Sequence, residues 1–304
     1  MGKKPLVYII ILNFNSFDET LRCIDSVRDV EYENYKVVVI DNNSQDGSVD
    51  ILKKRAGDFI LIENSDNLGY ARGNNVGIQY GISNGAEYIC VLNNDVEVKK
   101  DFLNIIIDYM EKNRKVGICG PCICDFENRT KIQSMGANIN LFTGLAMAKK
   151  KNKPYESVNG KTYEVDYLGG ACFVARKEVF DNIGFIPELY FLFYEETEFC
   201  LTAKRAGYKL ICLKDSLIYH KRSATISKYK GLSYYFLNRN RIIFMRRNAA
   251  IHHKVIFSLY LLLEAMGRIT LRREPLNLFK IYSEGLKADI NNPDLSKVSG
   301  FLKQ

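Results

Sequence analysis

The sequence predicts an α/β fold in which a mostly parallel central sheet carries helices on both faces. In the first hundred residues, short apolar runs alternate with segments of helical character, and the connections between them are short. Several of the apolar runs end directly at asparagine or aspartate, where open α/β sheets bind their ligands. At 304 residues, 47% hydrophobic and 26% charged, the chain has the composition of a globular protein with a sizeable core.

Four apolar runs are expected to be strands buried on both faces, because each is continuous and too short for a helix. They are residues 6–12, 37–40, 59–62 and 88–92. Polar residues follow each run and together suggest the floor of a ligand site. These are Asn13 and Asn15, residues 41–44 with Asp41 and Asn43, residues 64–67 with Asn67, and the triplet Asn93, Asn94 and Asp95.

Two helices are expected between these strands. Ser16 and Glu19 have the spacing of a capping box, which predicts a helix start at that point. A second helix is expected over 69–83, where Gly69, Gly73 and Gly77 recur every four residues and share one face. Such a glycine stripe indicates close approach of the helix to the sheet or to a ligand. The fingerprint G-x-G-x-x-G is absent after the first strand, which disfavours a dinucleotide-binding dehydrogenase.

The rest of the chain is expected to form further elements and a helical region. We predict strands over 116–123, 165–176 and 208–213, a hairpin within 131–147, a helix over 197–206, and helices from about residue 231 onward. The predicted organisation is a domain over 1–225, with a donor half at 1–115 and an acceptor or catalytic half at 116–225. A basic helical region over 226–304 follows it.

The cysteines and the charge indicate where the protein acts. The eight cysteines lie mostly within apolar stretches, and the chain opens without the apolar segment of a signal peptide, so we expect reduced thiols in a cytoplasmic protein. Residues 221–254 hold nine Lys or Arg and no carboxylate, which indicates either a solvated helical face or an anionic partner such as phosphates or an anionic membrane surface. Nucleic acid is disfavoured, since no recognised nucleic-acid motif accompanies the charge. The apolar run 255–263 is too short to span a bilayer. It predicts either a packing helix or an interfacial helix at the inner face of the membrane.

Three side chains or pairs are candidates for chemistry. Asp95, after a buried strand, is either a turn residue or a ligand for Mg²⁺ or Mn²⁺, and His220 would be an acceptable second ligand for Mn²⁺. Glu195 and Glu196 follow an aromatic run, so repulsion and apolar surroundings are expected to raise the pKa of at least one of them. A carboxylate tuned in this way is suited to general-base catalysis. The alternative is a helix start that favours acidic residues.

Taken together, the motifs resemble those of family 2 glycosyltransferases, and most closely a rhamnosyltransferase-like branch. The resemblance covers about residues 5–250. Its motifs are Tyr8–Asn15, Val39–Ser44, Asn67–Gly77, Leu92–Asp95, Gly169–Arg176, Glu195–Leu201, Arg205–Tyr208 and His220. It implies a GT-A fold with a helical C-terminal extension. It also implies a nucleotide-diphosphate sugar donor (UDP, dTDP or GDP), a divalent cation, inversion at the anomeric carbon, and a glycan or lipid-linked acceptor.

The resemblance also assigns roles to individual residues. Asn13 lies in the loop that holds the nucleotide, Asp41 matches the residue that contacts the base, and Arg72 belongs to a matched donor-site motif. Asp95 matches the metal-binding end of the D-x-D motif, and His220 completes the metal or diphosphate site. The loop Gly169-Gly170 lies near the acceptor, and Glu196 occupies the position of the catalytic base.

Two departures from the family pattern leave alternatives open. The D-x-D motif is Asn93-Asn94-Asp95, so one carboxylate is missing, and the base motif is Glu-Glu in place of Glu-Asp, so Glu195 is a rival base. A noncatalytic nucleotide- or carbohydrate-binding homologue therefore stays an alternative. A sugar nucleotidyltransferase is disfavoured, because no glycine-rich basic phosphate loop follows the first strand.

Overall fold

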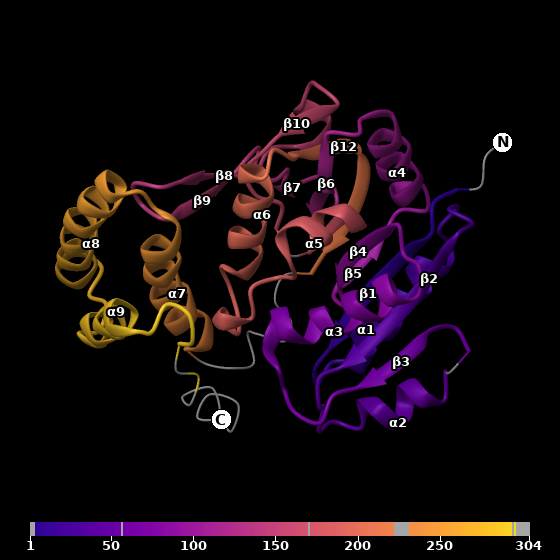
Figure 1. Ribbon diagram of the computed structural model, residues 1–304, viewed down its shortest axis with the longest axis horizontal. Helices are drawn as coiled ribbons and strands as arrows, with labels where there is room; N and C mark the ends of the chain where they lie inside the picture. The colour runs from indigo at the N-terminus through magenta and orange to yellow at the C-terminus, as the bar shows by residue number, and fades with distance from the viewer. Residues whose placement is uncertain (1–3, 56, 170, 222–230, 294, 296–304) are drawn as a thin grey trace.

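The computed structural model describes residues 4–55, 57–169, 171–221, 231–293 and 295. Helices cover both faces of one large central sheet, and a separate group of three helices packs at one end of the molecule (Figure 1). The predicted arrangement of a mostly parallel sheet flanked by helices is confirmed. All eight cysteines lie among the described residues and are buried and free, as expected of reduced thiols.

The strands of the large sheet run in the order β10-β12-β6-β11-β4-β1-β2-β3, with β5 on β12 and β7 on β6, while β8 and β9 form a separate hairpin. The bounds are β1 Val7–Asn13, β2 Tyr35–Asp41, β3 Ile60–Glu63, β4 Tyr88–Asn93, β5 Val96–Val98, β6 Val116–Asp125, β7 Ile132–Ser134, β8 Ala137–Asn140, β9 Leu145–Ala148, β10 Thr162–Glu164, β11 Cys172–Arg176 and β12 Lys209–His220.

The helices lie in three groups. On one face of the sheet lie α1, α2 and α4, on the other α3, α5 and α6, and α7 to α9 pack together beyond α6. Their bounds are α1 Phe17–Arg28, α2 Ser48–Lys53, α3 Gly69–Ser83, α4 Phe102–Lys112, α5 Lys177–Ile183, α6 Glu195–Arg205, α7 Leu232–Asn248, α8 Ile251–Leu271 and α9 Asn277–Lys287, with short 3₁₀ turns η1 Tyr155–Ser157 and η2 Glu188–Tyr190. The predicted domain boundary near 225 lies outside the described residues, so the division into two domains stays a prediction.

Strand order reverses at β1. Strand β1 pairs in parallel with both β2 and β4, although β4 comes after β3 in the chain. Such a switch point opens a crevice at the carboxyl ends of the two strands that flank it. The register places Asn13 beside Asp41 and Leu12 beside Asn93, so the polar strand ends predicted to form a floor do meet at this edge.

The glycine stripe of α3 serves contact with the sheet. A Cβ atom at Gly73 would lie 2.7 Å from Cδ1 of Leu12, and one at Gly77 would lie 2.5 Å from Cγ2 of Ile10. Both distances are below van der Waals contact, so the helix can approach β1 this closely only with glycine at these positions. Of the two interpretations of the stripe, packing against the sheet is therefore the one that applies to Gly73 and Gly77.

One predicted cap does not form, and two predicted strands have other bounds. Helix α1 does begin directly after Ser16 as predicted, but the Ser16 side chain makes no capping hydrogen bond, and Glu19 pairs with Arg22 and Lys221. The predicted strand 208–213 continues to His220 as one strand, β12. The predicted strand 165–176 begins only at Cys172, since residues 165–169 belong to no strand.

Candidate active site

The floor of the crevice is a network of buried side chains around Asp41. Asn13 Nδ2 donates to Asp41 Oδ2 at 2.7 Å, and Asn13 Oδ1 accepts from the Thr20 hydroxyl at 2.7 Å. Ser44 binds the same carboxylate twice, through its hydroxyl at 2.7 Å and its backbone N–H at 2.9 Å, and also accepts from the N–H of Asn15 at 2.9 Å. These bonds fix the orientation of the Asp41 carboxylate before any ligand binds.

Asn42 is a second buried hub, which the sequence analysis did not single out. Its Nδ2 donates to Asn67 Oδ1 at 2.8 Å and to the carbonyl of Gly69 at 3.2 Å. Its Oδ1 accepts from Asn64 Nδ2 at 3.0 Å and from the N–H of Leu68 at 3.1 Å. Asn42 therefore fastens the end of β2 to the loop that starts α3.

The other predicted donor-site residues are placed unequally. Asn94 belongs to the floor, since its Nδ2 donates to the Thr20 hydroxyl at 2.9 Å. Asn93 is half-buried at the end of β4, and Asn43 is half-buried in the turn after β2. Arg72 is 60% exposed and forms an ion pair with Glu188 at 3.4 Å. Their contacts with a donor remain predictions.

Asp95 and His220 are brought together by a strand pair that the sequence did not reveal. The short strand β5 follows Asp95 directly and pairs antiparallel with the end of β12, with Val96 opposite His220. As a result, His220 Nε2 lies 3.2 Å from Asp95 Oδ1, and both side chains are largely buried. A three-residue strand is too short to produce a periodic signal, which is why β5 was missed.

Gln133, from β7, orients the imidazole of His220. Its side-chain oxygen lies 2.6 Å from His220 Nδ1, while its Nε2 donates to the carbonyl of His220 at 3.4 Å. An amide oxygen is an acceptor, so Nδ1 carries the proton and Nε2 is the nitrogen turned toward Asp95. Partners of this kind fix the tautomer of metal-binding histidines in proteins. No pattern in the sequence marks Gln133.

These two side chains fit a divalent cation. Adjacent ligands around an ion with bonds of about 2.1 Å lie about 3 Å apart, close to the 3.2 Å between His220 Nε2 and Asp95 Oδ1. Imidazole together with carboxylate suits Mn²⁺ better than Mg²⁺. Within the described ranges no group of three His, Cys, Asp or Glu is arranged to share an ion.

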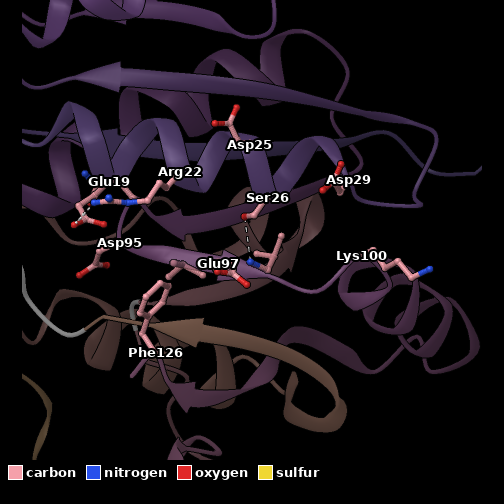
Figure 2. Close-up of a pocket in the computed structure, with 12 residues that line it drawn as sticks. Glu19, Arg22, Asp25, Ser26, Asp29, Asp95, Glu97, Lys100 and Phe126 are labelled. Carbon is pink, nitrogen blue, oxygen red and sulfur yellow. Dashed lines mark hydrogen bonds and ion pairs between the residues drawn. The ribbon is translucent and has the colours of Figure 1, made fainter. Parts of the chain in front are cut away.

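Asp95 also lines an open groove of about 460 Å³ between α1 and β5. Figure 2 shows Glu19 and Arg22 of α1 on one side of Asp95 and Phe126 on the other. Lys221, directly after His220, reaches Glu19 at 3.0 Å. Asp95 therefore lies in the wall of this groove, beside the cationic side chains of Arg22 and Lys221, while its Oδ1 is itself buried.

Glu195 and Glu196 form the first turn of α6, after a backbone segment with unusual geometry. Phe191, Phe193 and Tyr194 have backbone φ angles of 65°, 66° and 75°, which residues other than glycine rarely adopt. Asn240 of α7 holds this segment, because its Nδ2 donates to the carbonyls of Tyr190, Leu192 and Phe193. Such strain is typical of functional sites and persists where the surroundings fix it.

Burial changes the acidity of both glutamates. It raises the pKa of Glu196 to about 8, with a further contribution from the neighbouring Glu195, and raises the pKa of Glu195 to about 7. The prediction that at least one pKa of the pair is raised is confirmed, with desolvation as the larger cause. Oε2 of Glu195 and Oε1 of Glu196 are both buried and have no hydrogen-bond partner among the described residues.

The two carboxyl groups differ in their partners. Glu195 accepts from backbone N–H groups, its own and that of Phe193, so it stabilises the start of α6. Glu196 accepts from the hydroxyls of Tyr70 and Tyr167. No sequence signal singled out either tyrosine, although Tyr70 lies inside the motif 67–77 and Tyr167 lies two residues before Gly169. Gly169 itself lies in the loop before β11, and Gly170 lies outside the described residues.

Tyr70 joins the first turn of α6, which carries Glu195 and Glu196 and is called the acidic turn below, to the floor around Asp41. Its backbone N–H donates to the carbonyl of Phe191 at 2.8 Å, while the preceding Gly69 is bound by Asn42 of the floor. A Cβ atom at Gly69 would lie 2.6 Å from the carbonyl oxygen of Phe191, so the two segments are in close contact. Glu196 is therefore connected to the floor through Tyr70 and Gly69.

Comparison with known proteins agrees with this architecture. The family model "Glycosyl transferase family 2" matches residues 8–184, which is more than half of the chain. The chain belongs to glycosyltransferase family 2. The match contains the floor, Asp95, both tyrosines and Gly169, whereas Glu195, Glu196 and His220 lie beyond it.

The relatives include glycosyltransferases of prokaryotes. The "Low-salt glycan biosynthesis hexosyltransferase Agl10" of Haloferax volcanii is 29% identical over 65% of this chain and 61% of its own length. The "dTDP-rhamnosyl transferase RfbF" of Shigella flexneri is 25% identical over 80% of each chain. The resemblance of the motifs to rhamnosyltransferases is therefore matched by a relative that carries that name.

A solved structure supports the GT-A-like fold. The structure titled "Crystal structure of GalNAc-T7 with UDP, GalNAc and Mn2+" superposes with a TM-score of 0.69 at 16% sequence identity. The match covers all of this chain and 55% of that one. At this identity the similarity concerns the fold alone.

Proposed function

We propose that this protein transfers a sugar from a nucleotide-diphosphate donor to an acceptor hydroxyl, with inversion at the anomeric carbon. The observation that carries the proposal is the position of Glu196. Its buried carboxyl group is bound by Tyr70, and the backbone of Tyr70 connects it to the crevice at the switch point of the sheet. This connection between a candidate base and a candidate nucleotide floor supports a displacement in a single step, which requires both in one site.

In this mechanism Glu196 takes the proton from the acceptor hydroxyl as the oxygen attacks the anomeric carbon and the bond to the nucleoside diphosphate breaks. Burial favours proton uptake by Glu196, because its raised pKa makes the carboxylate a stronger base than an exposed glutamate. The hydroxyls of Tyr70 and Tyr167 hold the carboxylate in place. Asp41 and Asn13 orient the nucleotide.

Asp95 and His220 would hold a divalent cation, with Gln133 fixing the imidazole. A cation bound at this point supplies positive charge that stabilises the departing diphosphate. Lys221 and Arg22, at the groove beside Asp95, add positive charge at the same end of the site. The substitution of the first D-x-D carboxylate by Asn93 leaves the protein with fewer charged ligands, so we expect weaker metal binding than a complete motif gives.

The first donor to test is dTDP-rhamnose, because the relative from Shigella flexneri is named a dTDP-rhamnosyl transferase. UDP- and GDP-sugars are the alternatives. The acceptor class we propose is a glycan or lipid-linked saccharide hydroxyl in surface polysaccharide or glycan assembly, since the relative from Haloferax volcanii is named for glycan biosynthesis.

The experiment is a nucleotide-release screen over UDP-, dTDP- and GDP-sugars, with Mn²⁺, Mg²⁺ or a chelator. An active enzyme releases nucleotide from one donor class, and the release falls in the chelator. A noncatalytic binding homologue would bind a nucleotide without releasing it from any donor. The anomeric configuration of the product, determined by NMR, then tests inversion.

A further inference from the structure

The outward face of α8 is apolar over nearly its whole length. Ile251, Val255, Ile256, Leu259, Leu262, Leu263 and Met266 are between 45% and 82% exposed. Their spacing places them on one side of the helix, while Phe257, Leu261 and Ala265 face inward and are buried. An exposed apolar surface of this extent marks an interaction site.

The only carboxylate in α8 points away from this face. Glu264 accepts from Arg241 Nη1 at 2.9 Å and from the hydroxyl of Tyr282 at 3.0 Å, both on helices inside the three-helix group. The outward face therefore presents no negative charge. Exposed cationic side chains lie directly after α8 and on α9, namely Arg272, Arg273, Lys280 and Lys287.

The three-helix group as a whole carries an excess of positive charge. Residues 232–287 contain ten Lys or Arg and three Glu. Each of the three glutamates is bound inside the group: Glu264 by Arg241, Glu274 by Arg268, and Glu284 by the hydroxyl of Tyr235. The positive charge is therefore in excess and partly exposed, as expected of a surface that meets anionic groups.

The apolar face continues onto the hairpin of β8 and β9. The ring of Phe142, at the hairpin tip, lies 4.6 Å from the ring of His253 at the start of α8, and Phe142, Leu145 and Met147 are exposed. In Figure 1 the hairpin extends from the sheet toward α8 at the left end of the molecule. Two elements far apart in the sequence thus build one surface.

We propose that this surface, the outward face of α8 with the tip of the β8–β9 hairpin, docks onto an anionic lipid bilayer. An amphipathic helix with an apolar face and flanking cations lies in the plane of a membrane interface. Lys and Arg near the surface add attraction to anionic lipids. None of the described helices is long and apolar enough to cross a bilayer, so α8 lies along the surface.

The docking surface is rigidly joined to the acidic turn. The hydroxyl of Tyr194, the residue before Glu195, donates to the carbonyl of Gly144 in the hairpin at 2.9 Å. Arg241 binds the carbonyl of Thr143 at 2.7 Å as well as Glu264 of α8. A bilayer on this face therefore holds the acceptor side of the site close to the membrane, where an acceptor with a lipid anchor would be presented.

The test is flotation of the full chain with vesicles of phosphatidylcholine alone or of equal parts phosphatidylcholine and phosphatidylglycerol. We expect binding to the anionic vesicles, weakened by salt. The double variant Leu259→Asp/Leu262→Asp is expected to lower that binding at least about tenfold. Phe185→Asp, at an exposed apolar residue after α5, is the matched control and keeps wild-type binding.

A second variant tests the charge. Arg272→Gln/Lys280→Gln is expected to lower binding to anionic vesicles on the order of tenfold and to leave binding to neutral vesicles unchanged. Nucleotide release to water without lipid stays at the wild-type level in both variants, so failure of docking is distinguishable from failure of the proposed function.

Three results would overturn the proposal. The first is equal and negligible binding of the wild type to both vesicles. The second is wild-type flotation of the leucine double variant. The third is light scattering that shows a wild-type dimer and a monomeric leucine variant, because the face would then be covered by a second copy of the chain.

Discussion

His220 Nε2 lies 3.2 Å from Asp95 Oδ1, with Gln133 on the opposite ring nitrogen at 2.6 Å. Three strands supply this arrangement: β12 ends at His220, β5 follows Asp95, and β7 carries Gln133. The relationship unites the donor half of the sequence with the acceptor half. It also leads to a direct prediction about metal binding.

We expect His220→Ala to lower the affinity for Mn²⁺ by more than about tenfold, and Gln133→Ala to lower it by about tenfold. The reason is that the first variant removes a ligand, whereas the second leaves the imidazole free to rotate. Electron paramagnetic resonance titration of Mn²⁺ in the presence of the nucleoside diphosphate measures this without turnover. Wild-type Mn²⁺ affinity in His220→Ala would exclude His220 as a ligand.

The acidity of Glu196 predicts how stability depends on pH. Its pKa is about 8 in the folded protein and near the ordinary 4.5 in the unfolded chain. Between these values the folded protein keeps a proton that the unfolded chain has lost, so stability falls as pH rises through this window. Glu196→Gln removes this effect and should stabilise the protein at pH 8 by on the order of 2 kcal/mol.

Urea unfolding of the wild type and of Glu196→Gln at pH 8 and at pH 4 measures this difference. At pH 4 the carboxyl group is protonated in the folded state and largely protonated in the unfolded chain, so little gain is expected there. A gain of the same size at both pH values would show that the burial of charge is not its cause.

The glycine stripe of α3 gives a packing prediction. In Gly77→Ala the added Cβ atom would lie 2.5 Å from Cγ2 of Ile10, so α3 or β1 must shift. We expect a loss of about 1–3 kcal/mol in the free energy of unfolding. Gly267→Ala is the matched control, since Gly267 is also helical and has open space where a Cβ would be placed. It should be neutral or stabilising by up to about 1 kcal/mol.

Unlike Glu195 and Glu196, Glu198 in the first turn of α6 is bound by an arginine side chain. It binds Arg247 at 2.9 Å and Asn248 Nδ2 at 2.7 Å, and it accepts from the hydroxyl of Tyr190, which together tie α6 to the end of α7. Glu198→Ala leaves Arg247 without its carboxylate and is expected to cost about 3–5 kcal/mol of stability. Thermal unfolding checks this, and a wild-type melting temperature would contradict it.

Much of the fold was predictable because the signals are local. The continuous apolar runs that became β1, β2 and β4, and the glycine-containing helix α3, lie within a few residues of their predicted bounds. The antiparallel insertion of β11 between β4 and β6 was not predictable, because pairing between distant strands leaves no periodic mark on either one. The capping box at Ser16 does not form, and Glu19 pairs instead with Arg22 and with Lys221, which is distant in sequence.

The candidate site likewise contains residues that the sequence reveals and residues that only the structure reveals. Asp95, His220, Glu195 and Glu196 are recognisable from their residue types and motifs, whereas Gln133, Tyr70 and Tyr167 matter through their contacts alone. A glutamine or tyrosine has many ordinary roles, so its importance emerges only when topology places it beside a titratable group. Asn42 is intermediate, since it lies within the polar strand end that the sequence analysis identified.

The central claim is that Glu196, rather than Glu195, is the catalytic base. The most direct measurement compares the transfer rates of Glu196→Gln and Glu195→Gln with saturating donor and acceptor, with donor affinity determined separately by calorimetry. We predict that Glu196→Gln lowers the rate by about 10²- to 10⁴-fold with donor affinity retained, while Glu195→Gln keeps much of the activity. Full activity in Glu196→Gln together with loss of activity in Glu195→Gln would contradict the account.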